Sequence, residues 1–253
     1  MFACKRFLGV DLGSPNNLCY GELGRYPVFI AATLQAAKYW LRLSKMPESR
    51  IPKQAYLMLT RSYIPEGMNW AKSVAQCLSE LGFGYVWANG GTSNEKGFLK
   101  SLKQRLRDCY LQEWSSKLCL SSRYEFYKSF KTFFRCEPYL SYINIKKFRD
   151  SFIRFRLGCN SLKINARSNK DGNADMKCPV CNVIENESHF LIHCQLYDDI
   201  RQKYLSRHMY DRNLTSITYL MTSKHVQITR DVAMFTFYAF QRRKEVLSDI
   251  QED

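Results

Sequence analysis

Three cysteines and two histidines lie within the seventeen residues from Cys178 to Cys194. Cys178 and Cys181 form a Cys-x2-Cys turn, a spacing that brings two thiolates to one metal ion. Asn182 follows at a position that often needs left-handed backbone, which Asn tolerates. A seven-residue excursion then returns the chain with His189 to the same ion. The residue types and their spacing predict a zinc site.

The spacing leaves two candidates for the fourth ligand. His193 lies four residues after His189 and would share its face on a continuous helix. Cys194 lies one position farther round and requires a helix start or a bend between the pair. Thiolate-rich ligand sets are typical of closed structural zinc sites, which favours Cys194. A closed site has no open position for a substrate, and no Glu lies beside a His as in zinc hydrolases, so a catalytic zinc is not expected.

Positive charge is concentrated in one quarter of the chain. The 253 residues include 38 Lys and Arg against 23 Asp and Glu, a net charge of +15 that favours polyanionic partners. Fifteen of the basic residues, against six acidic ones, lie between Asn94 and Leu157. For any single residue a solvated helix face is the simpler interpretation. Collectively they predict phosphate contacts, for which the candidates are Lys146, Lys147, Arg149, Arg154, Arg156 and Arg201.

The pattern of apolar residues predicts a mainly α fold. Residues 1–26 are rich in Gly, Pro and Asn and are expected to form an ordered loop. Helices are predicted over 27–44, 52–63, 69–81, 94–118, 122–134, 143–157, 196–205 and 232–250, with Asn69 and Ser93 or Asn94 as caps. The expected architecture is a helical bundle, then a small Cys-Cys-His-Cys zinc-binding segment, then C-terminal helices. The corresponding domains are 1–157, 158–205 and 206–253.

The sequence contains no sign of export or membrane insertion. The N-terminus lacks the apolar run of a signal peptide. The longest apolar-rich stretch, 28–43, is interrupted by Gln35, Lys38 and Arg42, which predicts a core helix and not a membrane span. Ten cysteines without a secretory signal indicate a reducing compartment, so we expect an intracellular protein, cytoplasmic or nuclear.

The stretch CPVCNVIENESHFLIHCQLYDDIR resembles the C-terminal zinc-binding segment of LINE-type (non-LTR) retrotransposon reverse transcriptase polyproteins. These commonly have Cys-Pro-x-Cys, an acidic stretch, His-Phe-Leu, then Cys-Pro-x-Tyr and an Arg. The chain departs from this pattern at Asn182 and Gln195, neither of which is a ligand. Upstream, FRLGCNSL, YGELGRYPVFI and KYWLRL resemble the helical region that follows the polymerase domain. The resemblance implies that Cys194 is the fourth ligand and that the module helps to hold template RNA or target DNA.

No catalytic constellation is found in the sequence. Polymerases need carboxylates that bind a pair of metal ions, and reverse transcriptases present them after an aromatic residue. The only Asp-Asp pair is Asp198-Asp199, with Leu196 at the aromatic position, and we interpret it as a solvated helix face. The chain is therefore predicted to be a non-catalytic, zinc-stabilised nucleic-acid-binding fragment of low sequence specificity, with no small-molecule substrate. The alternative is a protein-interaction module in which zinc only staples the fold.

Overall fold

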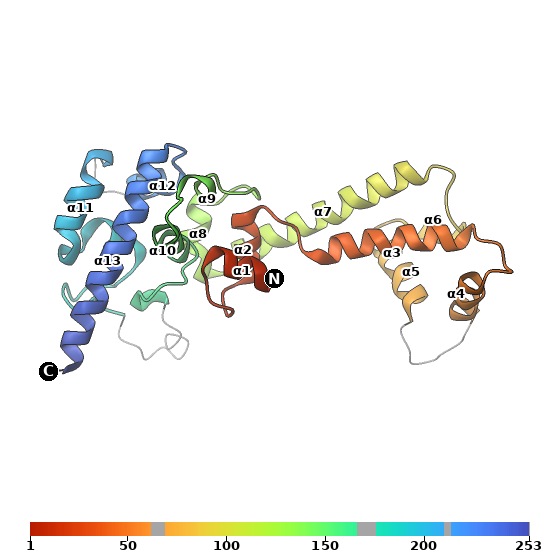
Figure 1. Cartoon of the computed structure of the whole chain (residues 1–253), viewed down its shortest axis with the longest axis horizontal. Coiled ribbons are helices and arrows are strands. Elements are labelled where there is room, and N and C mark those ends of the chain that lie inside the picture. The colour runs from red at the N-terminus through yellow and green to blue at the C-terminus, as the bar shows by residue number, and fades with distance from the viewer. Residues whose placement is uncertain (62–68, 166–175, 210–213, 253) are drawn as a thin grey trace. The chain divides into compact units, whose positions relative to one another are not determined.

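The structure, a computed structural model, describes residues 1–61, 69–165, 176–209 and 214–252 (Figure 1). It is 72% helical, and the described residues contain no β-strand. Only two isolated antiparallel bridges are formed there, between Leu23 and Cys136 and between Lys177 and Ile184. The predicted mainly α fold is confirmed. None of the described helices combines the length and apolar character that crossing a bilayer requires.

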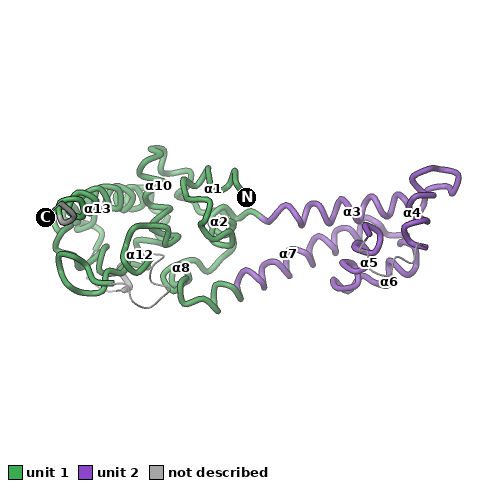
Figure 2. Tube along the Cα trace, turned by 90° about the horizontal axis from the view of Figure 1, so that it is seen from below, with its two compact units in different colours: residues 1–25, 116–253 green, residues 26–115 purple. Residues whose placement is uncertain are grey.

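The chain divides into two compact units (Figure 2). Unit 1 comprises residues 1–25 and 116–253, and unit 2 comprises residues 26–115. This division differs from the predicted boundaries at 157 and 205. The reason is that α10 (Lys146–Arg156) and α13 (Val226–Glu252), which those boundaries separate, pack against each other in one core.

Among the described residues, unit 2 is built from four helices at the predicted positions and one short helix, α6, that was not predicted. They are α3 (Val28–Ser44), α4 (Ile51–Arg61), α5 (Trp70–Glu80), α6 (Gly84–Ala88) and most of α7 (Glu95–Leu120). The side chain of Asn69 accepts a hydrogen bond from the backbone N–H of Lys72, and that of Asn94 from the N–H of Gly97, so both caps are confirmed. Inside the unit, the rings of Trp40 and Trp87 stack at 4.8 Å between centroids.

The N-terminal residues are helical, and the prediction of a loop over 1–26 is wrong. Helix α1 covers Phe2–Leu8 and α2 covers Asn16–Leu23. Gly9 and Gly24, with φ of 65° and 57°, are the left-handed residues that end these two helices. Glycine is the usual residue at that position because it has no Cβ to clash. The glycines therefore mark helix ends here.

The rest of unit 1 surrounds α13. Its helices are α8 (Glu125–Phe130), α9 (Tyr139–Tyr142), α10, α11 (Asp198–Tyr204) and α12 (Leu214–Thr222), with a 3₁₀ turn at Ser122–Tyr124. Helices α9, α10, α11 and α12 all pack on α13. The predicted helix 122–134 ends earlier, at Phe130, and the predicted helix 143–157 begins later, at Lys146. The shared core includes Phe152, Phe155, Phe190 and Phe235.

Candidate metal centre and basic cleft

Four of the five candidate ligands are brought together. The ligand atoms of Cys178, Cys181, His189 and Cys194 all lie within 4.8 Å of one another. The Sγ atoms of Cys178 and Cys181 are each 3.8 Å from the Sγ of Cys194. This cluster can hold a metal ion. His193 is exposed and is not part of it.

A short hairpin presents the first two cysteines. The bridge between Lys177 and Ile184 closes the hairpin, and the N–H of Cys178 donates to the carbonyl of Val183 at 2.7 Å. At its tip the N–H of Asn182 donates to the carbonyl of Cys178 at 2.9 Å. Asn182 has φ of 54°, the only positive φ among the described non-glycine residues. The left-handed conformation expected at this position is confirmed.

A turn of π-helix explains why Cys194, and not His193, meets His189. At 3.6 residues per turn, an α-helix would place Cys194 about 140° around the axis from His189. Residues His189–His193 instead form a wider π-turn, in which the N–H of Cys194 donates to the carbonyl of His189 at 2.8 Å. The extra residue in the turn brings Cys194 back over His189. The bend that the sequence required between the two ligands is this π-turn.

Without a bound cation, burial favours the neutral forms of Cys194 and His189. Burial raises the pKa of the Cys194 thiol, and the neighbouring Cys178 and Cys181 raise it further. Burial lowers the pKa of His189, against the opposing effect of Glu185, so the imidazole is neutral near pH 7. The Nε2 atom of His189 is buried and has no hydrogen-bond partner among the described residues. A cation would stabilise the thiolates and accept the unpaired lone pair.

Buried polar contacts anchor the segment from Cys178 to Cys194 within unit 1. Arg243 of α13 donates to both carboxylate oxygens of Glu185, at 2.7 and 2.6 Å, and both side chains are buried. Glu187 accepts a hydrogen bond from Asn165 at 2.7 Å. Next to His189, the ring of Phe190 stacks on Phe240 of α13 at 4.5 Å. The acidic stretch and the Phe therefore fix the segment to the helix.

Two of the six residues predicted to contact phosphates are buried in unit 1. Arg156 is 1% exposed, because it pairs with Glu22 at 3.0 Å and Glu137 at 3.5 Å inside unit 1. Arg201 is 3% exposed and donates to the carbonyls of Leu191 and Cys194 at 3.0 and 2.9 Å. Both guanidinium groups are engaged by interior partners and are out of reach of a phosphate.

The remaining four candidates are at least partly exposed, and they differ in their partners. Lys146 forms an ion pair with Asp150, and the guanidinium of Arg149 lies 5.4 Å from the centre of the Phe7 ring. Lys147 and Arg154 are exposed and line a cleft of about 1040 Å³ in unit 1. The structure therefore places two of the four at a concave surface, where Arg154 also donates to the carbonyl of Gly9 at 2.7 Å.

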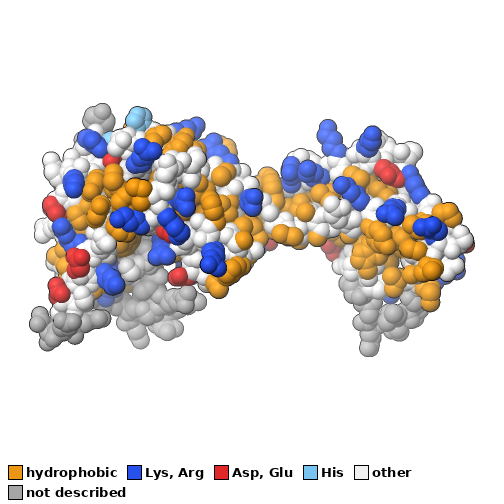
Figure 3. Space-filling model, in the orientation of Figure 1, with side chains coloured by type: hydrophobic (Ala, Val, Ile, Leu, Met, Phe, Trp, Pro, Cys, Tyr) orange, Lys and Arg blue, Asp and Glu red, His pale blue; other side chains and the backbone are white. Residues whose placement is uncertain are grey.

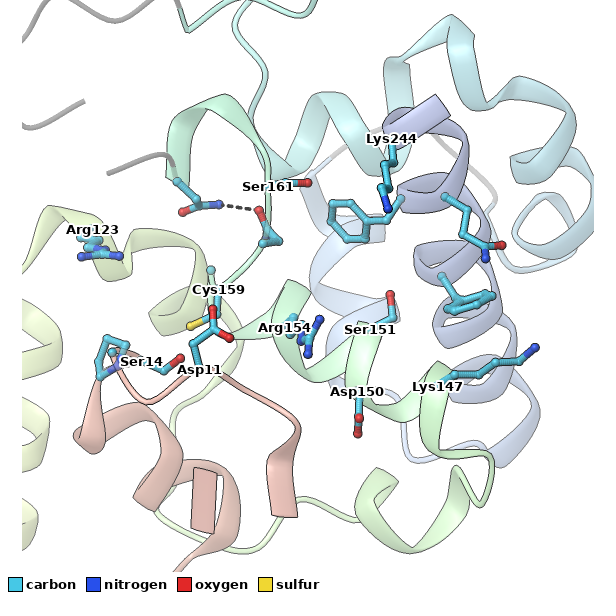
Figure 4. A pocket seen from close by; sticks show the side chains of 18 residues that line it. Asp11, Ser14, Arg123, Lys147, Asp150, Ser151, Arg154, Cys159, Ser161 and Lys244 are labelled. Atoms are coloured by element: carbon cyan, nitrogen blue, oxygen red, sulfur yellow. Dashed lines mark hydrogen bonds between the residues drawn. The ribbon is translucent and has the colours of Figure 1, made fainter. Parts of the chain in front are cut away.

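The cleft gathers four cationic side chains from separate parts of unit 1 (Figure 4). Arg123 and Lys244 join Lys147 and Arg154 there. In the described part of the chain, no carboxylate lies within ion-pair distance of any of the four. Two acidic residues also line the cleft, Asp11 and Asp150, and Lys146 already pairs with Asp150. We name this surface the basic cleft.

Two of these cations were missed from the sequence. Lys244 lies seven residues after Phe237 and three after Gln241, which places all three on one face of α13. Helical spacing therefore carried a signal for Lys244. Arg123 comes from a separate 3₁₀ turn, and nothing in its local sequence connects it to the cleft.

The Asp-Asp pair lies on the first turn of α11. Asp198 pairs with Arg201 and Asp199 with Arg242, and both carboxylates are more than half exposed. The bond to Arg242 lowers the pKa of Asp199. The two side chains are thus engaged by different arginines on a helix surface.

No protein-family model, curated protein or solved structure matches this chain.

Proposed function

We propose that the metal ion is zinc in a closed structural site. With Zn–S bonds of about 2.3 Å and tetrahedral angles, two sulfur ligands lie about 3.8 Å apart. The sulfur atoms of Cys178 and Cys181 each lie at this distance, 3.8 Å, from that of Cys194. Three thiolates and one imidazole complete a tetrahedron and leave no position for water or substrate. In this interpretation the metal stabilises the segment from Cys178 to Cys194.

We propose that unit 1 binds a polynucleotide through the basic cleft. The observation that carries this proposal is the gathering of Arg123, Lys147, Arg154 and Lys244 without carboxylate partners among the described residues. Like charges held together repel one another, and a row of phosphates relieves that repulsion while releasing counterions. The resemblance of the zinc segment to that of retrotransposon reverse transcriptases supports a polynucleotide over an acidic protein. The proposed role is binding without catalysis, because Asp198 and Asp199 are held by separate arginines.

Fluorescence anisotropy with a labelled single-stranded RNA of about twenty nucleotides, titrated at several salt concentrations, tests this role. The variant Lys147→Ala/Arg154→Ala/Lys244→Ala should bind all sequences more weakly. Its salt slope should fall by about 0.7 for each phosphate that the cleft no longer neutralises. The matched control is Lys96→Ala/Lys100→Ala/Lys103→Ala, which removes the same charge from the exposed side of α7 in unit 2.

Two results would contradict the proposal. Equally weakened binding in the two triple variants would show that net charge matters and the basic cleft does not. Zinc-loaded protein that does not bind even at low salt, or binds independently of salt, would favour the protein-interaction module.

A further inference from the structure

Three aromatic rings form a continuous row on α13 and α11, with a lysine at each end. The rings of Phe237 and Tyr238 lie 5.3 Å apart, and those of Tyr238 and Tyr204 lie 5.8 Å apart. The ammonium of Lys147 is 5.0 Å from the centre of the Phe237 ring, and that of Lys203 is 5.2 Å from the Tyr204 ring. We name Phe237, Tyr238 and Tyr204 the aromatic row.

The row connects the basic cleft to a second hollow. Phe237 lines the basic cleft, whereas Tyr238 and Tyr204 line a hollow of about 330 Å³. Gln241 lines both. Lys203 and Arg242 line the second hollow as well, together with the carboxylates of Asp199 and Glu245, and Asp199 pairs with Arg242. Cations, carboxylates and partly exposed rings thus lie together along the two hollows. Figure 3 shows one face of the molecule, on which blue, orange and red side chains are interspersed.

The rings of the row have open surface, unlike the aromatic residues of the core. Tyr238 is 36% exposed, and Phe237 and Tyr204 are partly exposed, whereas Phe190 and Phe235 are completely buried. The planes of Tyr204 and Tyr238 are parallel within 3°. Fully overlapped rings would lie about 3.5–4 Å apart, so a centroid distance of 5.8 Å means that the rings are displaced sideways. Part of each ring face therefore remains uncovered beside the hollow.

We propose that the aromatic row stacks the unpaired bases of a single-stranded polynucleotide whose phosphates lie on the basic cleft. This inference rests on the proposed function and specifies its ligand as single-stranded. Bases in a duplex stack on one another and are closed to side chains, whereas bases in a single strand present their faces to aromatic rings. A partner that carried only carboxylates would match the lysines and leave the rings without a ligand. A positively charged groove beside aromatic rings is the arrangement that single-strand sites use.

Three labelled probes of about twelve nucleotides separate stacking from charge: a uridine RNA, the same RNA annealed to its complement, and an abasic strand with the same phosphates. The single strand should bind at least about fivefold more tightly than the abasic strand, because each stacked base contributes about 1–3 kcal/mol. The duplex should also bind more weakly than the single strand.

Variants of Tyr238 and Tyr204 assign this difference to the row. Tyr238→Leu keeps apolar packing but removes the ring, and should weaken binding at least about fivefold for the uridine strand and not at all for the abasic strand. Tyr204→Leu should act in the same direction. Tyr238→Phe keeps the ring and should bind like the original protein. Tyr85→Leu, at a tyrosine of α6 that is 64% exposed in unit 2, is the control.

The outcomes distinguish this inference from the function on which it rests. If the abasic strand binds as tightly as the uridine strand and Tyr238→Leu changes nothing, the stacking inference is overturned. The basic cleft would still stand if Lys147→Ala/Arg154→Ala/Lys244→Ala weakened binding. If no probe binds at low salt, both fall. Unchanged far-ultraviolet circular dichroism and metal content in each variant would establish that weaker binding comes from removal of the ring.

Discussion

The two units differ in whether polar side chains are buried in their interiors. Among the described residues, every buried polar or charged side chain belongs to unit 1, including Glu22, Arg156, Glu185 and Arg243. All four tryptophans of the chain, at positions 40, 70, 87 and 114, belong to unit 2. Unit 1 therefore contains paired buried charges and a cluster that can hold a metal ion, whereas the buried side chains described in unit 2 are apolar. We expect unit 1 to respond to chelators and acid, and unit 2 to be insensitive to both.

The exposed cations of the units differ in the same way. On α7 of unit 2, Lys96, Lys100, Lys103 and Arg105 are exposed along one helix. In unit 1, cations from separate segments converge on the basic cleft. Helical spacing looks alike in both cases. Whether the cations converge depends on the segments that pack beside the helix. A count of charges along the sequence therefore predicts a phosphate-binding surface less well than the position of each charge in the fold.

Removal of a metal ligand is expected to have the largest effect. Cys181→Ser should abolish zinc binding and raise amide exchange over 176–205, because ligand binding and local folding share one free energy. Tryptophan emission should not change, since all tryptophans lie in unit 2. Cys109→Ser, at an exposed cysteine of α7, is the control.

The same experiment tests the choice of the fourth ligand. Cys194→Ser should lose zinc, whereas His193→Ala should retain it because His193 is exposed and outside the cluster. The reverse pattern would show that the ligand assignment is wrong. Full zinc content in Cys181→Ser would contradict the proposed metal site as a whole.

Removal of the buried guanidinium is expected to be the next largest effect. Arg156→Met removes the only ion-pair partner that the described residues give to the buried Glu22, which keeps a hydrogen bond from Tyr139, while Glu137 keeps Lys131. The variant should lower the free energy of unfolding of unit 1 by about 3–5 kcal/mol. Lys103→Met, at an exposed cation of α7, should change stability by no more than about 0.5 kcal/mol. Urea unfolding followed by circular dichroism measures both. Equal losses of unfolding free energy in the two variants would show that the buried cation contributes no more to stability than the exposed one.

Acid should destabilise unit 1 more than unit 2, because unit 1 contains the buried carboxylate of Glu22. Burial raises the pKa of this carboxyl, but the charge and hydrogen bonds of Arg156 outweigh burial and hold the pKa below the usual 4.5. A lowered folded pKa means that stability is present above pH 4.5 and is lost as pH falls through the folded value. Glu22→Gln should therefore reduce the dependence of unit 1 stability on pH below about 4.5. An unchanged dependence in Glu22→Gln would assign acid sensitivity to other groups, the metal ligands included.

The sequence predicted what local patterns control. Helices α3, α4, α5 and α7, two asparagine caps and the left-handed Asn182 all follow from residues close together in the chain. The burial of Arg156 could also have been predicted from helical spacing. It lies four residues after Phe152, on the apolar side of α10.

Features that depend on tertiary contacts were not predictable. The buried pair of Glu185 with Arg243 joins residues 58 positions apart, and no local spacing connects them. The basic cleft likewise needs Arg123 and Lys244, which converge only in the folded unit. At the N-terminus, the spacing of the glycines is compatible both with a loop and with the ends of short helices. Only the packing of α1 and α2 decides between them.

The smallest expected effect concerns a helix cap in unit 2. Asn94 accepts a hydrogen bond from the N–H of Gly97 at the start of α7, at 2.9 Å, on the surface. Asn94→Ala leaves that N–H to water and should lower the free energy of unfolding by about 1 kcal/mol, while Asn94→Asp, which retains an acceptor, should cost little. Urea unfolding followed by tryptophan emission reports this destabilisation in unit 2 alone. Because the cap lies in the unit without a metal-binding cluster among its described residues, zinc content should stay unchanged. Zinc loss in Asn94→Ala would show that the stability of unit 1 depends on unit 2, and the contrast between the units would no longer hold.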